Sequence, residues 1–248
     1  MKNLLKPTNL PIVTAALGGI ALVLRRVLYA VAVDAKNLLP VNHPLEIALG
    51  IFTGLVLACI AASVWKLDGS GRYEDNFQAD VPALVGHAAA AAGILITVLT
   101  NAPMMPGYLG NFWKVLGFAA PVCLFAAGYA RLQGKQPFFL LHLIPCLFLV
   151  FHIVNHYQTW SGNPQFQDYG FALFGSMALV FFSFYTAAFD VEAGRRRMQL
   201  GMGLAAVYLC LAELAMTQYV WLYLGGIVWA LTDLCSLNPV PKPAEDEA

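Results

Sequence analysis

The sequence predicts an all-α integral membrane protein, a bundle of helices that crosses a lipid bilayer several times. Of its 248 residues, 59% are hydrophobic and only 11% are charged, whereas a typical soluble domain carries about 45–50% and about 25%. The apolar residues lie in runs close to the roughly 20 residues that a helix needs to cross a bilayer. So few charged side chains cannot cover a surface that faces water, and lipid is therefore the expected solvent.

Polar or turn-rich segments separate six such runs. These six predicted spans are residues 11–33, 44–65, 81–100, 110–130, 137–157 and 169–189. A further apolar run, residues 200–237, would be about 57 Å long as one helix, against a hydrocarbon core of about 30 Å. This run must turn back, and we place its turn at Thr217 and Gln218. The resulting seventh and eighth spans are residues 200–216 and 219–237. Eight spans are predicted, with seven as the alternative.

The distribution of positive charge predicts the orientation of this single membrane domain, residues 1–248. Ten of the 14 lysines and arginines lie in the two termini and the even-numbered loops, whereas the opposite side of the membrane has only Lys36 and Lys114. The positive-inside rule therefore predicts a multi-pass protein of the plasma membrane with a cytoplasmic N-terminus. The Arg25-Arg26 pair argues against cleavage of the first apolar run as a signal peptide.

The net charge also restricts the classes of partner that the protein can bind. The formal net charge is zero and no long run of like charge is present, which argues against binding to nucleic acid. The bilayer is the expected partner. A homo-oligomer or a partner subunit stays open.

A few ionisable residues lie where lipid would not tolerate them alone. Arg25 and Arg26 lie in the outer half of the first span, where charged side chains usually face a cavity or a partner. Glu46 opens the second span, and Glu213 lies near the outer end of the seventh. Together with two histidines of the fifth span they predict a polar vestibule that opens outward and binds a ligand. The vestibule consists of Arg25, Arg26, Glu46, His152, His156 and Glu213. Ion pairing with a purely structural role is the alternative.

The fifth span carries a stripe of histidines. His142, His152 and His156 fall within an arc of roughly 80° on a helix. His152 and His156 are four residues apart, so their rings are neighbours and could hold one metal ion such as zinc. His87 and His142 lie at equal depth on separate spans, as haem ligation by two histidines requires. No cofactor is predicted, and zinc and haem stay open.

The H-x-x-x-H spacing of His152 and His156 resembles that of transmembrane metal-dependent hydrolases, the family that includes ceramidases and the progestin and adipoQ receptors. This resemblance implies a zinc-dependent hydrolase that also uses a serine and a histidine of an early span, and an aspartate. Ser63 lacks a histidine four residues further on, which departs from that pattern.

Small residues predict where helices approach closely in lipid. Gly50 and Gly54 form a G-x-x-x-G motif on the second span, and the third carries an alanine run at residues 88–92. We expect these two helices to lie centrally. A dimer seam at Gly50 and Gly54 is the alternative.

These observations favour a membrane protein that binds or transports a small polar or anionic solute through the vestibule. One alternative is an intramembrane metal-dependent enzyme that uses His152 and His156. A second is a non-catalytic membrane subunit or sensor whose output lies on another chain.

Overall fold

The computed structural model describes residues 9–32, 43–65, 67, 69–103, 105, 107–162 and 166–238, except the side chains of residues 158–161 and 166–168. Within these residues the chain forms nine α-helices and no strand. They are α1 (Leu10–Ala32), α2 (Pro44–Val64), α3 (Tyr73–Asn76), α4 (Val81–Thr100), α5 (Tyr108–Leu132), α6 (Leu140–Ser161), α7 (Phe166–Phe189), α8 (Arg196–Glu213) and α9 (Val220–Cys235). All are long except α3, which forms a single turn.

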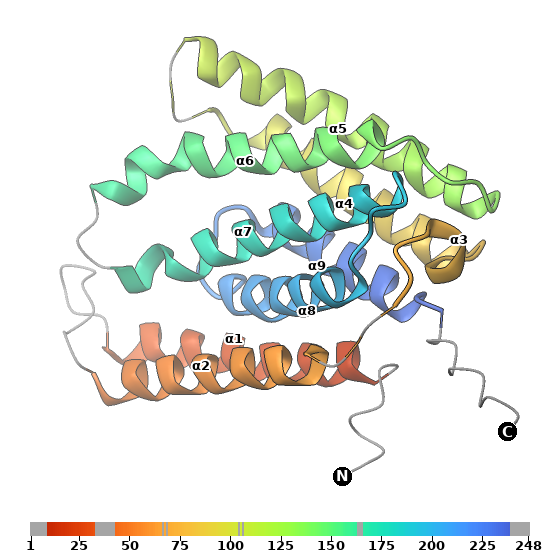
Figure 1. The fold of residues 1–248 in the computed structure, drawn as a ribbon. Helices are drawn as coiled ribbons and strands as arrows, with labels where there is room; N and C mark the ends of the chain where they lie inside the picture. Colours follow the sequence, from red (N-terminus) through yellow and green to blue (C-terminus); the bar gives the residue numbers. More distant parts are fainter. Residues whose placement is uncertain are drawn as a thin grey trace, which may run out of the picture.

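The long helices run alternately in opposite directions, so every second connection lies at the same end of the bundle (Figure 1). The start of α1, the helix α3 and the end of α9 lie at one end, which we call the α3 end. The connection between α8 and α9 lies at the other, which we call the turn end. The break predicted at Thr217 and Gln218 is confirmed, because α8 ends at Glu213 and α9 begins at Val220.

The structure supports a helical, multi-pass membrane bundle. In the described part of the chain, six helices are long and apolar enough to cross a membrane, and they are α1, α2, α4, α5, α6 and α7. The predicted seventh and eighth spans correspond to α8, with 18 residues, and the apolar α9, with 16 residues. Eight crossings and a cytoplasmic N-terminus stay predictions.

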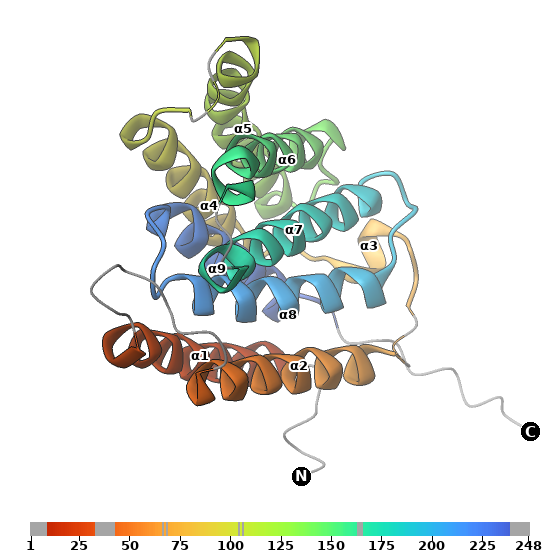
Figure 2. The ribbon, with the colours of Figure 1, turned by 90° about the vertical axis from the view of Figure 1, so that its left-hand side faces the viewer.

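The helix α8 forms the middle of the bundle. Twelve of its 18 residues are buried, and it contacts α1 and α2 on one side and α7 and α9 on another. The two views agree on this arrangement, with α1 and α2 as a separate layer below α8 (Figure 2). A helix surrounded in this way tolerates polar residues, because few of its side chains face lipid.

Glycines bring α4 and α9 into close contact. A Cβ atom on Gly93 would lie 2.3 Å from the backbone oxygen of Trp221, and one on Gly225 would lie 2.7 Å from the backbone oxygen of Ala89. Only hydrogen atoms in place of side chains allow the two backbones to approach so closely. The expectation that the third predicted span, now α4, packs through small residues is confirmed.

The expectation for the second span is wrong. A Cβ atom on Gly50 or Gly54 would meet no atom within 4 Å, and only 22% of the apolar window of α2 is buried. The helix α2 therefore lies at the periphery, and its G-x-x-x-G motif does not hold two helices of this chain together.

We expect Gly93→Ala to lower the free energy of unfolding by about 1–3 kcal/mol, because the new methyl group would overpack the α4–α9 contact. Gly19→Ala is the matched control on α1, where a Cβ meets nothing within 4 Å. Unfolding in detergent, followed by circular dichroism, measures both variants. Equal stability of Gly93→Ala and Gly19→Ala would contradict the close approach of α4 and α9.

Candidate functional site

Arg25 and Glu213 form a buried ion pair at the turn end. The Arg25 side chain is 1% exposed, and its Nη1 donates hydrogen bonds to Glu213 Oε2 and, at 3.2 Å, to the backbone oxygen of Ala212. The ring of Phe171 lies 4.9 Å from the guanidinium carbon of Arg25. The pair joins α1 to the last residue of α8. A charge on α1 is thereby neutralised inside the protein and does not face lipid.

Arg26 and Glu46 lie nearer the surface of the same end. Arg26 is exposed, and its Nη1 donates a hydrogen bond to the backbone oxygen of Ala215, in the connection after α8. Glu46 is half-buried in the first turn of α2. It lines a groove of about 410 Å³ together with Arg25. The two arginines therefore have different roles, one inside the bundle and one at its surface.

The histidine pair of α6 is buried. The ring centroids of His152 and His156 lie 4.4 Å apart, and the hydroxyl of Tyr219 lies 3.2 Å from His156 Nδ1. His152 is fully buried, and neither of its ring nitrogens has a hydrogen-bond partner among the described residues. The described residues contain no group of three or more His, Cys, Asp or Glu side chains that could hold a metal ion.

All six residues of the predicted vestibule lie at the turn end, in two neighbouring places. Arg25, Glu46 and the groove lie on the α1–α2 side of the bundle. The histidine pair lies with Tyr219, which follows the α8–α9 turn, and neither histidine lines the groove. Glu213 and Tyr219 flank the same turn and connect the two places along the chain.

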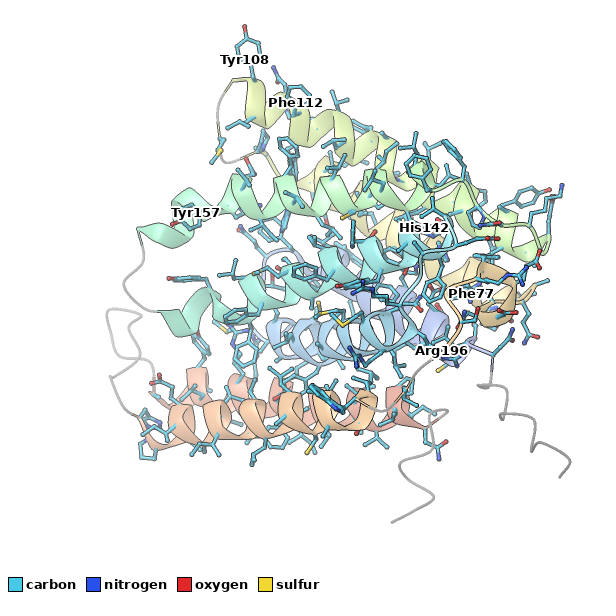
Figure 3. All side chains as sticks on the ribbon, viewed as in Figure 1. Phe77, Tyr108, Phe112, His142, Tyr157 and Arg196 are labelled. Atoms are coloured by element: carbon cyan, nitrogen blue, oxygen red, sulfur yellow. The ribbon has the colours of Figure 1, made fainter. Side chains whose placement is uncertain are left out.

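A second polar cluster lies at the α3 end, where the histidines predicted to share one depth, His87 and His142, are in contact. The other three members of this cluster were not recognised from the sequence. We call it the α3-end network, and it consists of His87, Arg131, His142, Asp190 and Asp233. Figure 3 shows His142 near Phe77 and Arg196 at this end, and Tyr157, on the same helix α6 as His142, at the other. All five residues of the network are buried. They come from α4, α5, α6, α9 and the residue after α7.

The network is a chain of short contacts. His87 Nε2 and His142 Nε2 are 3.1 Å apart, and His142 Nδ1 is 2.6 Å from Asp190 Oδ2. Arg131 Nη1 donates to Asp233 Oδ1 at 2.6 Å. The same oxygen of Asp233 lies 3.9 Å from His87 Nδ1. An acid on α9 and an acid at the end of α7 thus lie on either side of two touching histidines.

Each hydrogen-bonding contact of the two histidines requires one proton. His87 Nδ1 lies 2.7 Å from the backbone oxygen of Ala83, which can only accept, so this nitrogen carries a proton. The contact between His87 Nε2 and His142 Nε2 requires one proton, carried by one of the two rings. The contact of His142 with Asp190 needs a further proton, on Nδ1 or on the carboxyl group.

The contact between His87 and His142 can be compared with the geometry of haem ligation by two histidines. Two imidazole nitrogens that hold one metal ion from opposite sides lie about 4 Å apart, at about 2 Å from the metal each. His87 and His142 lie closer, at 3.1 Å, and the indole of Trp229 stacks on His142 with an interplanar angle of 6°. The pair as placed is a hydrogen bond and does not fit haem ligation.

Arg131 and Asp233 escaped the sequence analysis because each lies close to the end of a span. Arg131 was counted as a loop charge for the orientation, yet its side chain is only 3% exposed and lies over the ring of Phe77 at 4.4 Å. Asp233 is the only acid in the last apolar segment, residues 219–237. This isolated acid was the available signal, because an unpaired carboxylate is not stable there.

We expect Asp233→Leu to lower the free energy of unfolding by about 3–5 kcal/mol, because it leaves the Arg131 charge buried without a partner. The double variant Arg131→Met with Asp233→Leu should recover much of this loss. Thermal unfolding in detergent of the wild type, both single variants and the double variant measures the coupling. Additive losses in the double variant would mean that the two charges do not depend on each other.

Comparison with known proteins adds no assignment. No family model, no curated protein and no solved structure matches this chain. The candidate site therefore rests on the geometry of its own residues.

Proposed function

We propose that the protein is a membrane carrier that couples the movement of protons to the binding and transport of a small polar or anionic solute. The observation that carries the proposal is the hydrogen-bonded chain Asp190–His142–His87 beside the Arg131–Asp233 pair. Ionisable side chains inside a membrane protein are costly and usually mark ion or proton pathways. A structural role needs only the ion pair, whereas two touching histidines supply ring nitrogens that can each donate or accept a proton.

The α3-end network would act as the proton-handling part. A proton accepted on Asp190 can pass to His142 and then to His87, and the Arg131–Asp233 pair lies beside this chain. In addition, Asp190 Oδ1 and Asp233 Oδ2 make no hydrogen bond to the described residues, so each acid keeps one oxygen to accept a proton. Because the network joins four helices and the residue after α7, its protonation would change how these segments hold together.

The turn end would act as the solute-binding part, with Arg25, Arg26, Glu46, His152, His156 and Glu213 as the proposed ligand-binding residues. Arg25 is already neutralised by Glu213. An anionic group of the solute would therefore replace Glu213 as the partner of Arg25, and Glu213 would take up a proton or turn away. Such an exchange of partners links solute binding to a change in protonation.

The test is proton uptake by proteoliposomes that contain a pH-sensitive dye, with a panel of amino acids and small carboxylates added outside. We expect at least one solute to acidify the interior through the wild-type protein. His142→Gln should reduce this signal to that of empty liposomes, because the amide cannot relay a proton. His43→Gln is the matched control, since His43 lies outside both clusters and only caps α2. Acidification by His142→Gln at the wild-type rate would refute the proton-handling role.

A metal-dependent enzyme is the second candidate, favoured by one observation. His152 and His156 are adjacent on α6, and His152 has no hydrogen-bond partner among the described residues although it is fully buried. Two neutral imidazoles at this spacing can hold one metal ion, with the phenol of Tyr219 as a third contact.

For this candidate we expect the wild-type protein, purified after growth with zinc and iron, to retain about one metal ion per chain by mass spectrometry of the elements. His152→Ala should lose it, because only one imidazole remains. His87→Ala is the control from the other end of the bundle. A wild-type protein without stoichiometric metal would leave the carrier as the only candidate of the two.

A further inference from the structure

The groove at the turn end is open to the side of the bundle, between the α1–α2 layer and α7. It has a volume of about 410 Å³, within the range of about 300–1,000 Å³ that is typical of small-molecule sites. Residues of α1, α2, α7 and α8 line it. The described contacts between helices join α2 to α1 and α8, and α7 to α6 and α8. The groove therefore lies where α2 and α7 stay apart.

One face of α2 forms the long wall of the groove. Glu46, Gly50, Thr53, Gly54 and Leu57 all line it, and their spacing places them on one side of a helix. From Glu46 to Leu57 the wall is about 16 Å long. The two glycines widen the groove, because a Cβ atom at either position would meet nothing within 4 Å. The G-x-x-x-G motif thus borders open space that a narrow apolar chain could fill.

The two ends of this wall differ in polarity. At one end lie two ionisable groups, Glu46 on α2 and the buried Arg25 on α1, which is paired with Glu213. At the other end the wall consists of glycine and leucine. A molecule that matches both ends has a zwitterionic head and an apolar tail.

We propose that this groove binds a single membrane amphiphile with a zwitterionic amino-phosphate headgroup. The phosphate replaces Glu213 as the partner of Arg25, the ammonium group contacts Glu46, and the acyl chain lies along Gly50, Gly54 and Leu57. The inference goes beyond the proposed function, because it assigns an amphiphile and not a small solute to the turn end, and it rests on that proposal only for transport. Binding itself does not need proton coupling.

A second copy of the chain fits the groove less well. A helix with its side chains is about 10–12 Å across. An acyl chain is narrower than a helix and can lie against the backbone of α2.

The test is thermal stabilisation of the full-length protein in detergent by lysophosphatidylethanolamine, lysophosphatidylglycerol or phosphoethanolamine alone. We expect lysophosphatidylethanolamine to raise the unfolding midpoint most. Phosphoethanolamine has the same headgroup without a tail, so equal stabilisation by it would overturn the role of the apolar wall. Equal stabilisation by lysophosphatidylglycerol would overturn the pairing of the ammonium group with Glu46.

Two variants test the groove itself. Gly54→Leu fills it, and we expect the stabilisation by lysophosphatidylethanolamine to be lost. Gly19→Leu is the matched control, because its Cβ also meets nothing within 4 Å and Gly19 does not line the groove. Glu46→Gln should abolish the preference for the amino-phosphate headgroup, which keeps the proposal testable if Gly54→Leu does not fold. A Gly54→Leu protein that keeps full stabilisation, or that only changes oligomeric state, would overturn it.

The proton-uptake assay distinguishes the two proposals. Loss of acidification in Gly54→Leu with binding also lost supports a common ligand. Binding that survives in a protein that moves no protons would overturn the carrier and leave the amphiphile site intact.

Discussion

Every charge that this bundle buries requires a partner on another helix, and this constraint determines where α8 and α9 lie. A lone charge in a low-dielectric interior costs several kcal/mol by typical estimates, so Arg25 on α1 must meet Glu213 on α8, and Arg131 on α5 must meet Asp233 on α9. The acids thus sit on the last two long helices, which occupy interior positions. The outer helices α1 and α5 carry the arginines toward them.

The sequence could predict the helices because their lengths follow from the thickness of the bilayer. The turn between α8 and α9 followed from the same arithmetic, since residues 200–237 are too long for one crossing. The partners of the buried charged side chains were harder to predict. Glu213 was placed at the depth of Arg25, and the two are paired. Asp190 and Asp233 were not recognised, because an acid near the end of a span is equally compatible with water and with a buried contact.

Small residues illustrate the same limit. A glycine allows a close approach, but the sequence of one helix does not say what approaches it. Gly93 and Gly225 meet the backbone of a neighbouring helix, whereas Gly50 and Gly54 border open space. In sequence, α2 and α4 both show closely spaced small residues. The difference lies in the neighbours of each helix, because α4 packs between α5 and α9, whereas α2 packs on α1 and α8 only at the edge of the bundle.

The histidine stripe of α6 reaches both ends of the bundle. His142 lies in the α3-end network and His152 and His156 lie beside Tyr219, so one rigid helix carries a titratable group into each end of the bundle. The helix α9 does the same, with Asp233 at one end and Tyr219 just before the other. Between the two ends the facing side chains are apolar, as at Ile94, Leu149 and Leu222. In the proposed carrier, these apolar side chains would separate the two ends, and coupling between the ends would require helix movement.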